Sequence, residues 1–232
     1  MDYQLSPGED AEQEVREDRV RARIGRHLAW LGSDLTWTLE WHSLYRAHAL
    51  SLDRYLHERI VFAGDAAHLV PIFGVRGLNS GLEDAETLAW QLAAVVRGTA
   101  SPELLESYAS ERRAVWEQNI AAAGKSTRIM TPGSRGYTAT RDALLSLAVG
   151  HPEFRQLVDP RQASATHARS SPLTWGTRQQ SPTPGDPVAD RRVRVRTPDG
   201  ERSSSLHHER GTGFSVIGVD VAAPALAAGH RR

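Results

Sequence analysis

Apolar residues recur at helical spacing close to the start of the chain. Over residues 11–31 they fall every three to five positions among charged residues, as expected for the buried face of an amphipathic helix. They are Val15, Val20, Ile24, Leu28 and Leu31. Gly32 follows directly, and glycine is common just beyond the end of a helix. We therefore predict a helix over residues 11–31.

The next segment has a period of two. Between residues 35 and 41 every second position is a leucine or a tryptophan. This alternation is typical of a half-buried strand, so we predict a strand there. Its two tryptophans, Trp37 and Trp41, fit the core of a sheet better than a stacking platform for a ligand.

A short apolar run, a loop and a second helical pattern follow one another between residues 59 and 98. The run at residues 60–63 predicts a fully buried strand that ends at Gly64-Asp65. We predict that the helix begins at Leu78-Asn79 and ends at Gly98. Its apolar stripe, which we expect to be buried, comprises Leu78, Leu82, Ala85, Leu88 or Ala89, Leu92 and Val96.

Another helix is predicted from Ser101. This serine is a suitable N-cap, Pro102 fits the first helical position, and Glu103 lies near the positive end of the helix dipole. The apolar stripe of this helix comprises Leu104, Leu105, Tyr108, Val115 and Ile120.

The character of the chain changes from about His151. Residues 160–190 are rich in Pro, Ser, Thr, Gln and Gly, which is typical of a linker or an extended surface segment. Two strand-like runs follow, Arg191–Val195 and Phe214–Val221, separated by a turn and a polar stretch.

Composition narrows the classes of function. The 232 residues are 40% apolar, enough to bury the core of one large or two small domains. Basic and acidic residues number 28 each, so charge gives no case for nucleic acid as a partner. The absence of cysteine excludes disulfides and thiolate metal sites. The acidic N-terminus lacks an apolar segment, so we expect no signal peptide, no membrane span and a cytoplasmic protein.

The loop between the predicted strand and helix carries the candidate chemistry. Asp65 is expected at the carboxyl end of a strand, where its carboxylate can accept hydrogen bonds from ribose-like hydroxyls. Pro71, Gly74 and Gly77 shape a loop whose backbone can approach a ligand, and the helix start favours partial negative charge. Each feature also has a plainer interpretation, with Asp65 as a turn cap and the glycines as ordinary loop residues.

His68 lies in the same loop. No second His, Asp or Glu stands at metal-ligand spacing with it, so we predict no metal site. A hydrogen-bonded structural role for His68 is favoured over a role as a base or a ligand.

The segment from Gly64 to Trp90 resembles the second FAD-binding motif of the class A flavoprotein aromatic hydroxylases, which are FAD-dependent monooxygenases acting on phenols. The pattern of that family is GDAAHxxPPxxGxGxNxGxxDAxNLxW. The matching residues are Gly64-Asp65-Ala66-Ala67-His68, Pro71, Gly74, Gly77, Asn79, Gly81, Asp84-Ala85 and Leu88-Ala89-Trp90. Ile72 replaces the second proline and Glu86-Thr87 the usual polar pair. Further on, LLESYASERRAVW is similar to the family phrase LLxSYxxERRPxA.

The resemblance implies FAD as cofactor, NAD(P)H as co-substrate, and hydroxylation of a small aromatic substrate with O2. For the loop it implies contact of Asp65 with the ribityl hydroxyls of FAD, while Pro71 and the carbonyl of Ile72 line the flavin face. It assigns no catalytic residue, and the catalytic residues stay unknown at this point.

At the helix start, the resemblance implies contact between the flavin and the backbone of Gly77, Leu78 and Asn79. These groups meet the pyrimidine carbonyl, where a helix N-terminus stabilises negative charge on the reduced ring. Arg76 adds positive charge near the same ring edge, with a solvated arginine as the alternative.

For the fold, the resemblance implies an α/β (α+β) fragment. Residues 1–58 are the end of a substrate-domain sheet, and 59–150 are the C-terminal part of the FAD-binding domain, with its last strand and long helices. Residues 151–185 are a linker, and 186–232 are an incomplete thioredoxin-like tail.

A flavin hydroxylase also needs a Rossmann βαβ unit with a GxGxxG turn, which this sequence lacks. We therefore expect a C-terminal fragment that is inactive alone and is completed by a separate N-terminal Rossmann segment or by homo-oligomerisation. The alternative is a non-catalytic remnant or an interaction subunit with the fold of the hydroxylase tail.

Overall fold

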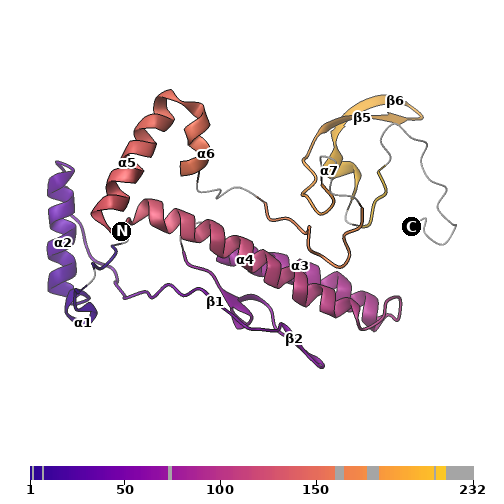
Figure 1. The fold of residues 1–232 in the computed structure, drawn as a ribbon, viewed down its shortest axis with the longest axis horizontal. Helices are drawn as coiled ribbons and strands as arrows, with labels where there is room; N and C mark the ends of the chain where they lie inside the picture. The colour runs from indigo at the N-terminus through magenta and orange to yellow at the C-terminus, as the bar shows by residue number, and fades with distance from the viewer. Residues whose placement is uncertain are drawn as a thin grey trace. The chain divides into compact units, whose positions relative to one another are not determined.

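The structure is a computed structural model that describes residues 1, 3–6, 8–72, 75–159, 165–176, 183–211 and 213–217. The chain divides into two compact units, Met1–Ala163 and Ser164–Arg232. Helices predominate in the first unit, and a two-stranded hairpin lies in the second (Figure 1). The protein therefore has a mixed helix and strand fold.

Two helices begin the first unit. α1 (Ala11–Glu14) and α2 (Glu17–Trp30) cover the helix predicted over residues 11–31, which is confirmed with an interruption at Val15-Arg16. Gly32, at φ +67°, follows in the left-handed conformation that favours glycine. Neither helix contains a fully buried residue, so the predicted apolar face is only partly covered.

The strand predicted over residues 35–41 is wrong. Residues 33–49 contain no helix or strand, and Leu35 and Trp41 are 73% and 75% exposed. An alternating sequence forms a strand only where a neighbouring strand supplies backbone partners, and none of the described strands pairs with this segment. Trp37 lies instead against α2, with the Arg21 Cζ atom 5.6 Å from the centre of its ring.

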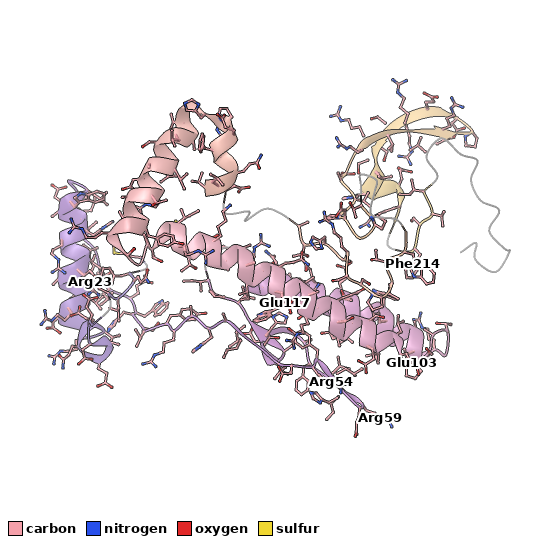
Figure 2. All side chains as sticks on the ribbon, in the orientation of Figure 1. Arg23, Arg54, Arg59, Glu103, Glu117 and Phe214 are labelled. Carbon is pink, nitrogen blue, oxygen red and sulfur yellow. The ribbon has the colours of Figure 1, made fainter. Side chains whose placement is uncertain are left out.

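Two short antiparallel ribbons follow. β1 (Leu50–Ser51) pairs with β4 (His68–Leu69), and β2 (Leu56–His57) pairs with β3 (Ile60–Val61). Figure 2 shows Arg59 at the tip of the second ribbon. β1 lies before Asp65 in the sequence and β4 lies after it, so the first ribbon pairs the segments on the two sides of this residue. The second ribbon is a hairpin that ends at Val61, shortly before Asp65.

The strand predicted over residues 60–63 is shorter than expected. β3 ends at Val61, because β2 is its only partner among the described strands and pairs at two positions. The Phe62 N–H then donates to the Tyr55 carbonyl at 2.8 Å, and the single-turn helix η1 (Gly64–Ala66) follows.

Two long helices form the main body of the first unit and lie side by side (Figure 1). α3 (Gly77–Val96) confirms the predicted helix, and Gly98, at φ +69°, follows its end. α4 (Leu104–Met130) begins later than predicted, because the Ser-Pro pair at residues 101–102 lies outside the helix and Glu103 takes the N-cap position.

The core of this unit lies where α4 meets the ribbons. Tyr55, Ala67 and Tyr108 are buried there. The partly buried residues that pack against them are Val61, Phe62, Leu88 and Ala109. In α4, the predicted burial of Tyr108 and Val115 is confirmed.

Much of the apolar stripe of α3 faces solvent, contrary to the prediction, although Leu88 packs against the core. Leu78, Leu82 and Val96 are 76%, 61% and 77% exposed. The residues that α3 buries are polar, namely Ser80, Asp84 and Gln91. The periodicity identified the helix correctly, but its polar side packs against η1 and α4, where two of the three buried residues find hydrogen-bond partners.

Three further helices complete the first unit: α5 (Arg135–Gly150), η2 (Pro152–Phe154) and α6 (Arg155–Val158). Ser134 caps α5, its hydroxyl accepting the N–H of Tyr137 at 3.2 Å. None of the helices in the described part of the chain has the length and apolarity that a membrane span requires.

The second unit contains a hairpin and the short helix α7 (Leu206–Glu209). β5 (Arg192–Thr197) matches the first of the two predicted strand-like runs. Its partner β6 (Gly200–Ser205) is polar, which is why the apolar pattern missed it. In the second predicted run, residues 214–217 form no strand, and residues 218–221 lie outside the described part.

Candidate functional site

Asp65 lies in the middle of η1, beyond the end of β3 rather than at it as predicted. Gly64 begins this turn at φ +57°, a left-handed conformation that glycine adopts without strain. The side chain of Asp65 is exposed and has no hydrogen-bond or ionic partner among the described residues. Its carboxylate is therefore available to accept hydrogen bonds from a ligand.

The helix next to this turn begins at Gly77, one residue before its predicted start. Over the described residues, the first N–H of α3 with a hydrogen bond is that of Ser80, which donates to the Arg76 carbonyl at 2.9 Å. A Cβ atom built on Gly77 would meet no described atom within 4 Å, and Leu78 and Asn79 are exposed. The first turn therefore adjoins open space, and its N–H groups favour partial negative charge there.

η1 and the first turns of α3 are in contact. A Cβ atom on Gly81 would lie 3.8 Å from the Cα atom of Gly64, an ordinary van der Waals distance. One turn further along α3, the Asp84 carboxylate accepts the backbone N–H of Gly64 at 2.8 Å. These two contacts hold the turn that carries Asp65 beside α3.

Arg76, which directly precedes α3, is buried. It is 8% exposed, and its Nη1 donates to Oδ1 of Asn119 on α4 at 2.8 Å. Nδ2 of Asn119 in turn donates to Oγ of Ser80 at 2.7 Å. The alternative of a solvated Arg76 is therefore wrong.

The loop before α3 holds the other candidates. Pro71 is half-buried, while Ile72, which stands where the hydroxylase pattern has its second proline, is 46% exposed. Gly74 lies outside the described residues. At the end of the loop, Asn79 Nδ2 donates to the carbonyl of Val75 at 3.1 Å and so supplies a hydrogen bond that ties the loop to α3.

Asp84 is the centre of a buried polar cluster. Its Oδ2 accepts hydrogen bonds from the Gly64 N–H and from Nε2 of His68, the latter at 2.7 Å, and its Oδ1 accepts one from Nε of Arg112 at 2.5 Å. Asp84 is fully buried, and His68 and Arg112 are 4% and 5% exposed. Arg112 Nη2 also donates to the Ser80 carbonyl at 3.2 Å. The Asp84 cluster comprises Gly64, His68, Ser80, Asp84, Arg112 and Asn119.

Charge pairing sets the ionisation of this cluster. Burial alone would raise the pKa of the Asp84 carboxyl, but hydrogen bonds from His68 and Arg112 outweigh it and hold that pKa below its ordinary value. An ionised carboxylate only accepts hydrogen bonds, so Nε2 of His68 is the donor. His68 thus has the hydrogen-bonded structural role that was predicted.

α4 also holds the backbone on both sides of η1. Tyr108 donates its hydroxyl to the Phe62 carbonyl at 2.9 Å, and Nε1 of Trp116 donates to the Leu69 carbonyl at 3.1 Å. Burial raises the pKa of Tyr108, and a nearby carboxylate adds to the shift, so its hydroxyl remains a donor. The candidate turn is therefore fixed to one long helix at its start and its end.

The sequence pattern assigned no role to Arg112 or Asn119, and it matched Asp84 without giving it a function. One clue was available. An acid inside a helix that packs against a second helix needs a positive partner there, and the ERR phrase of α4 supplies one. Composition and periodicity alone could not select Arg112 over Arg113, because that choice depends on which side of α4 faces α3.

These residues fit one side of a flavin site. The exposed carboxylate of Asp65 suits hydroxyl donors, and the open start of α3 at Gly77 suits an electron-rich ring acceptor. The buried positive charge of Arg76 lies one residue before that helix start. The geometry, an exposed carboxylate on a turn beside an open helix N-terminus, is of the kind that suits a nucleotide-like cofactor.

The comparison with known families identifies that cofactor. Residues 3–123 match the family described as FAD binding domain. The chain belongs to this family, whose cofactor is FAD. The resemblance to FAD-dependent aromatic hydroxylases inferred from the motif is therefore confirmed.

Individual relatives and solved structures are similar to parts of this chain. A 3-(3-hydroxy-phenyl)propionate/3-hydroxycinnamic acid hydroxylase of Mycolicibacterium smegmatis is 33% identical over 175 residues, which are 75% of this chain and 31% of that protein. A dialkyldecalin synthase of Streptomyces rugosporus is 40% identical over 53% of this chain and 26% of its own length. The p-nitrophenol 4-monooxygenase PnpA of Pseudomonas putida DLL-E4 has a TM-score of 0.52 at 27% identity, over 64% of this chain and 40% of that structure. The chain spans about three tenths of the length of the curated relatives it matches.

Proposed function

We propose that this chain supplies the flavin-contacting C-terminal part of a FAD-dependent monooxygenase that hydroxylates a small phenolic or other aromatic substrate. One observation carries the proposal. An exposed Asp65 turn lies beside the N-terminus of α3 in a chain of the FAD binding domain family. The similarity to an aromatic hydroxylase supports the substrate class.

Seven residues of this chain bind the cofactor in the proposal, namely Asp65, Pro71, Gly74, Arg76, Gly77, Leu78 and Asn79. Asp65 accepts hydrogen bonds from the ribityl hydroxyls of FAD. The backbone of Gly77, Leu78 and Asn79 meets the pyrimidine carbonyl, where the helix N-terminus stabilises negative charge. Arg76 adds positive charge from its buried position directly before the helix.

The loop before α3 supplies the face of the site that is turned to the substrate. Pro71 and Gly74 shape this loop, and Ile72 stands at the edge where the hydroxylase pattern has a proline. When bound, FAD supplies the redox chemistry, in which electrons from NAD(P)H and oxygen from O2 convert an aromatic ring to its hydroxylated product. The residues of this chain bind and orient the cofactor, and none of them is assigned as a catalytic acid or base.

The fuller organisation follows the hydroxylase pattern. Residues 1–58 form the end of a substrate-domain segment, and 59–150 the last strand and long helices of the FAD-binding domain. Residues 151–185 form a linker, and 186–232 a partial thioredoxin-like tail. We place the protein in the cytoplasm.

The exposed stripe of α3 supports a partner surface. Leu78, Leu82 and Val96 present apolar side chains to solvent on one side of this helix. Large exposed apolar surfaces mark interaction sites in soluble proteins. In the proposal this side packs against a Rossmann-type segment that binds the ADP half of FAD.

The same stripe favours a second candidate function, an interaction subunit that keeps the fold of the hydroxylase tail without binding flavin. FAD titration separates the two. The purified chain is titrated alone and beside a supplied N-terminal segment of an aromatic hydroxylase relative, and phenol-dependent NAD(P)H oxidation is measured in both samples.

The chain alone should bind FAD weakly and oxidise no NAD(P)H in response to a phenol, because the pyrophosphate has no glycine-rich turn to receive it. The supplied segment should raise both signals. A yellow, active protein from residues 1–232 alone would contradict the need for a partner, and no flavin binding in either sample would favour the interaction subunit.

A further inference from the structure

We infer that Asp84 is a positioning residue that fixes the spacing between the Asp65 turn and the N-terminus of α3, with Arg112 and Asn119 as its supports on α4. The inference rests on the proposed flavin site, since the turn and the helix start are the two parts of that site. It concerns residues that touch neither FAD nor substrate in the proposal.

Asp84 acts on the turn through a single oxygen atom. Its Oδ2 accepts the backbone N–H of Gly64, the residue before Asp65, at 2.8 Å. The same oxygen accepts a hydrogen bond from Nε2 of His68, two residues after the end of η1, at 2.7 Å. One carboxylate oxygen therefore closes the turn from both ends. The Asp65 carboxylate between them has no described partner of its own, so its position is set through the backbone, to which these two bonds contribute beside the bonds from Tyr108 and Trp116.

The helix start is held from α4. Arg112 donates from Nε to the other Asp84 oxygen and from Nη2 to the Ser80 carbonyl, at 2.5 and 3.2 Å. Asn119 contacts the same turn of α3 from a second point, donating to Oγ of Ser80 and accepting from Nη1 of Arg76. Arg112 is thus bonded both to the residue that closes the η1 turn and to the first turns of α3.

The burial of Asp84 makes the η1 turn depend on the charge pairs of this residue. Asp84 is fully buried, so its charge is tolerated only while Arg112 and His68 pair with it. The bonds of the cluster end on the backbone beside Asp65 and on Ser80, Glu83 and Arg76 at the start of α3, and they end on no apolar side chain of the core. Removal of the Asp84 charge should therefore increase local opening of the η1 turn more than local opening of the rest of the first unit.

Amide hydrogen exchange of the purified 232-residue chain tests this without cofactor. Asp84→Asn keeps the shape of the side chain but removes the charge that Arg112 and His68 contact. Loss of charge-assisted hydrogen bonds predicts exchange about 10- to 100-fold faster across residues 60–69, with α5 unchanged. Asp142→Asn is the matched control, because Asp142 also pairs with an arginine, Arg141, but on the surface of α5.

A second variant leaves the charge pairs of Asp84 intact. Asn119→Leu removes both bonds of Asn119 and should speed exchange in the first turns of α3 while leaving residues 60–69 nearly unchanged. Gln118→Leu, at the neighbouring position of α4, is its control. Faster exchange spread evenly over η1, α3, α4 and α5 in either cluster variant would mean that the cluster only stabilises the fold, and would overturn the inference.

A double-mutant cycle on FAD affinity, measured with the supplied N-terminal segment, gives the readout that a purely structural role does not move. If Asp84 positions Asp65, then Asp65→Ala should reduce affinity less in the Asp84→Asn background than in the wild type. Additive losses would overturn the inference. Failure of the wild type to bind FAD would instead contradict the proposed function, while the exchange experiment still decides the role of Asp84.

Discussion

Replacement of Asp65 by alanine separates binding from stability more cleanly than any other single change in this chain. The Asp65 carboxylate is exposed and has no hydrogen-bond or ionic partner among the described residues, so the folded protein gains little from it. In the proposed site, however, it is the one charged acceptor for the ribityl hydroxyls. Asp65→Ala should therefore change FAD affinity and leave folding almost unchanged.

The expected size follows from the kind of bond that is lost. A hydrogen bond to a charged group contributes about 1.5–3 kcal/mol, which corresponds to a loss of affinity of roughly 10- to 100-fold. A surface substitution without native contacts changes the free energy of unfolding by about 0.5 kcal/mol or less. The two quantities thus differ severalfold in size and are separable in one set of samples.

Fluorescence titration with FAD, in the presence of the supplied N-terminal segment, measures the first quantity, and urea unfolding of the chain measures the second. Asp34→Ala is the control, because Asp34 is also exposed but lies in the irregular segment before β1. An unchanged dissociation constant for Asp65→Ala would remove Asp65 from the site. A loss of stability larger than that of the control would refute the argument that the side chain has no structural partner.

Four further outcomes are expected. Tyr108→Phe leaves the buried Phe62 carbonyl without its donor and should lower the free energy of unfolding by about 1 kcal/mol in urea titration, with little change in FAD affinity. The folded pKa of Asp84 lies below its ordinary value of 3.8. The ionised carboxylate therefore contributes its full stabilisation above that value, and this stabilisation is lost as pH falls through the folded pKa. Acid titration followed by circular dichroism should show a steeper loss of folded structure below about pH 4 for the wild type than for Asp84→Asn. Gln91 is fully buried, and neither polar atom of its side-chain amide has a hydrogen-bond partner in the described part. Gln91→Leu should therefore raise the free energy of unfolding by about 1–3 kcal/mol. A lower free energy of unfolding, measured by urea titration, would show that the amide is hydrogen-bonded. Leu82→Lys on the exposed side of α3 should weaken association with the supplied N-terminal segment in analytical ultracentrifugation while leaving the helix content of the chain unchanged.

The long helices were predictable because their evidence is local. α3 and α4 each carry an apolar repeat over several turns, and α3 is followed by a glycine in the left-handed conformation. The turn at Gly64-Asp65 was predictable for a related reason, since Gly64 adopts a left-handed conformation that favours glycine. Such features are present in the sequence whatever surrounds them.

Features that depend on distant partners were not predictable in this way. The alternating residues 35–41 have the pattern of a strand but no described neighbouring strand, so they form none. For the same reason β3 stops at Val61. The roles of Asp84 and Arg112 likewise depend on the packing of α3 against α4, and no periodicity within either helix indicates which polar residues will meet.

The two sides of α3 differ, because one side has a fixed set of polar contacts and the other is exposed to solvent. Its inner side places Ser80 and Asp84 against η1 and α4, where hydrogen bonds and charge pairing fix one arrangement. Its outer side presents Leu78 and Val96 to solvent. Fully burying a side chain of this kind stabilises by about 1.5–3 kcal/mol, so covering several of them at once offsets part of the free-energy cost of association. In the proposed function, the polar side therefore sets the geometry of the cofactor turn, and the apolar side contributes free energy for packing against the Rossmann-type segment.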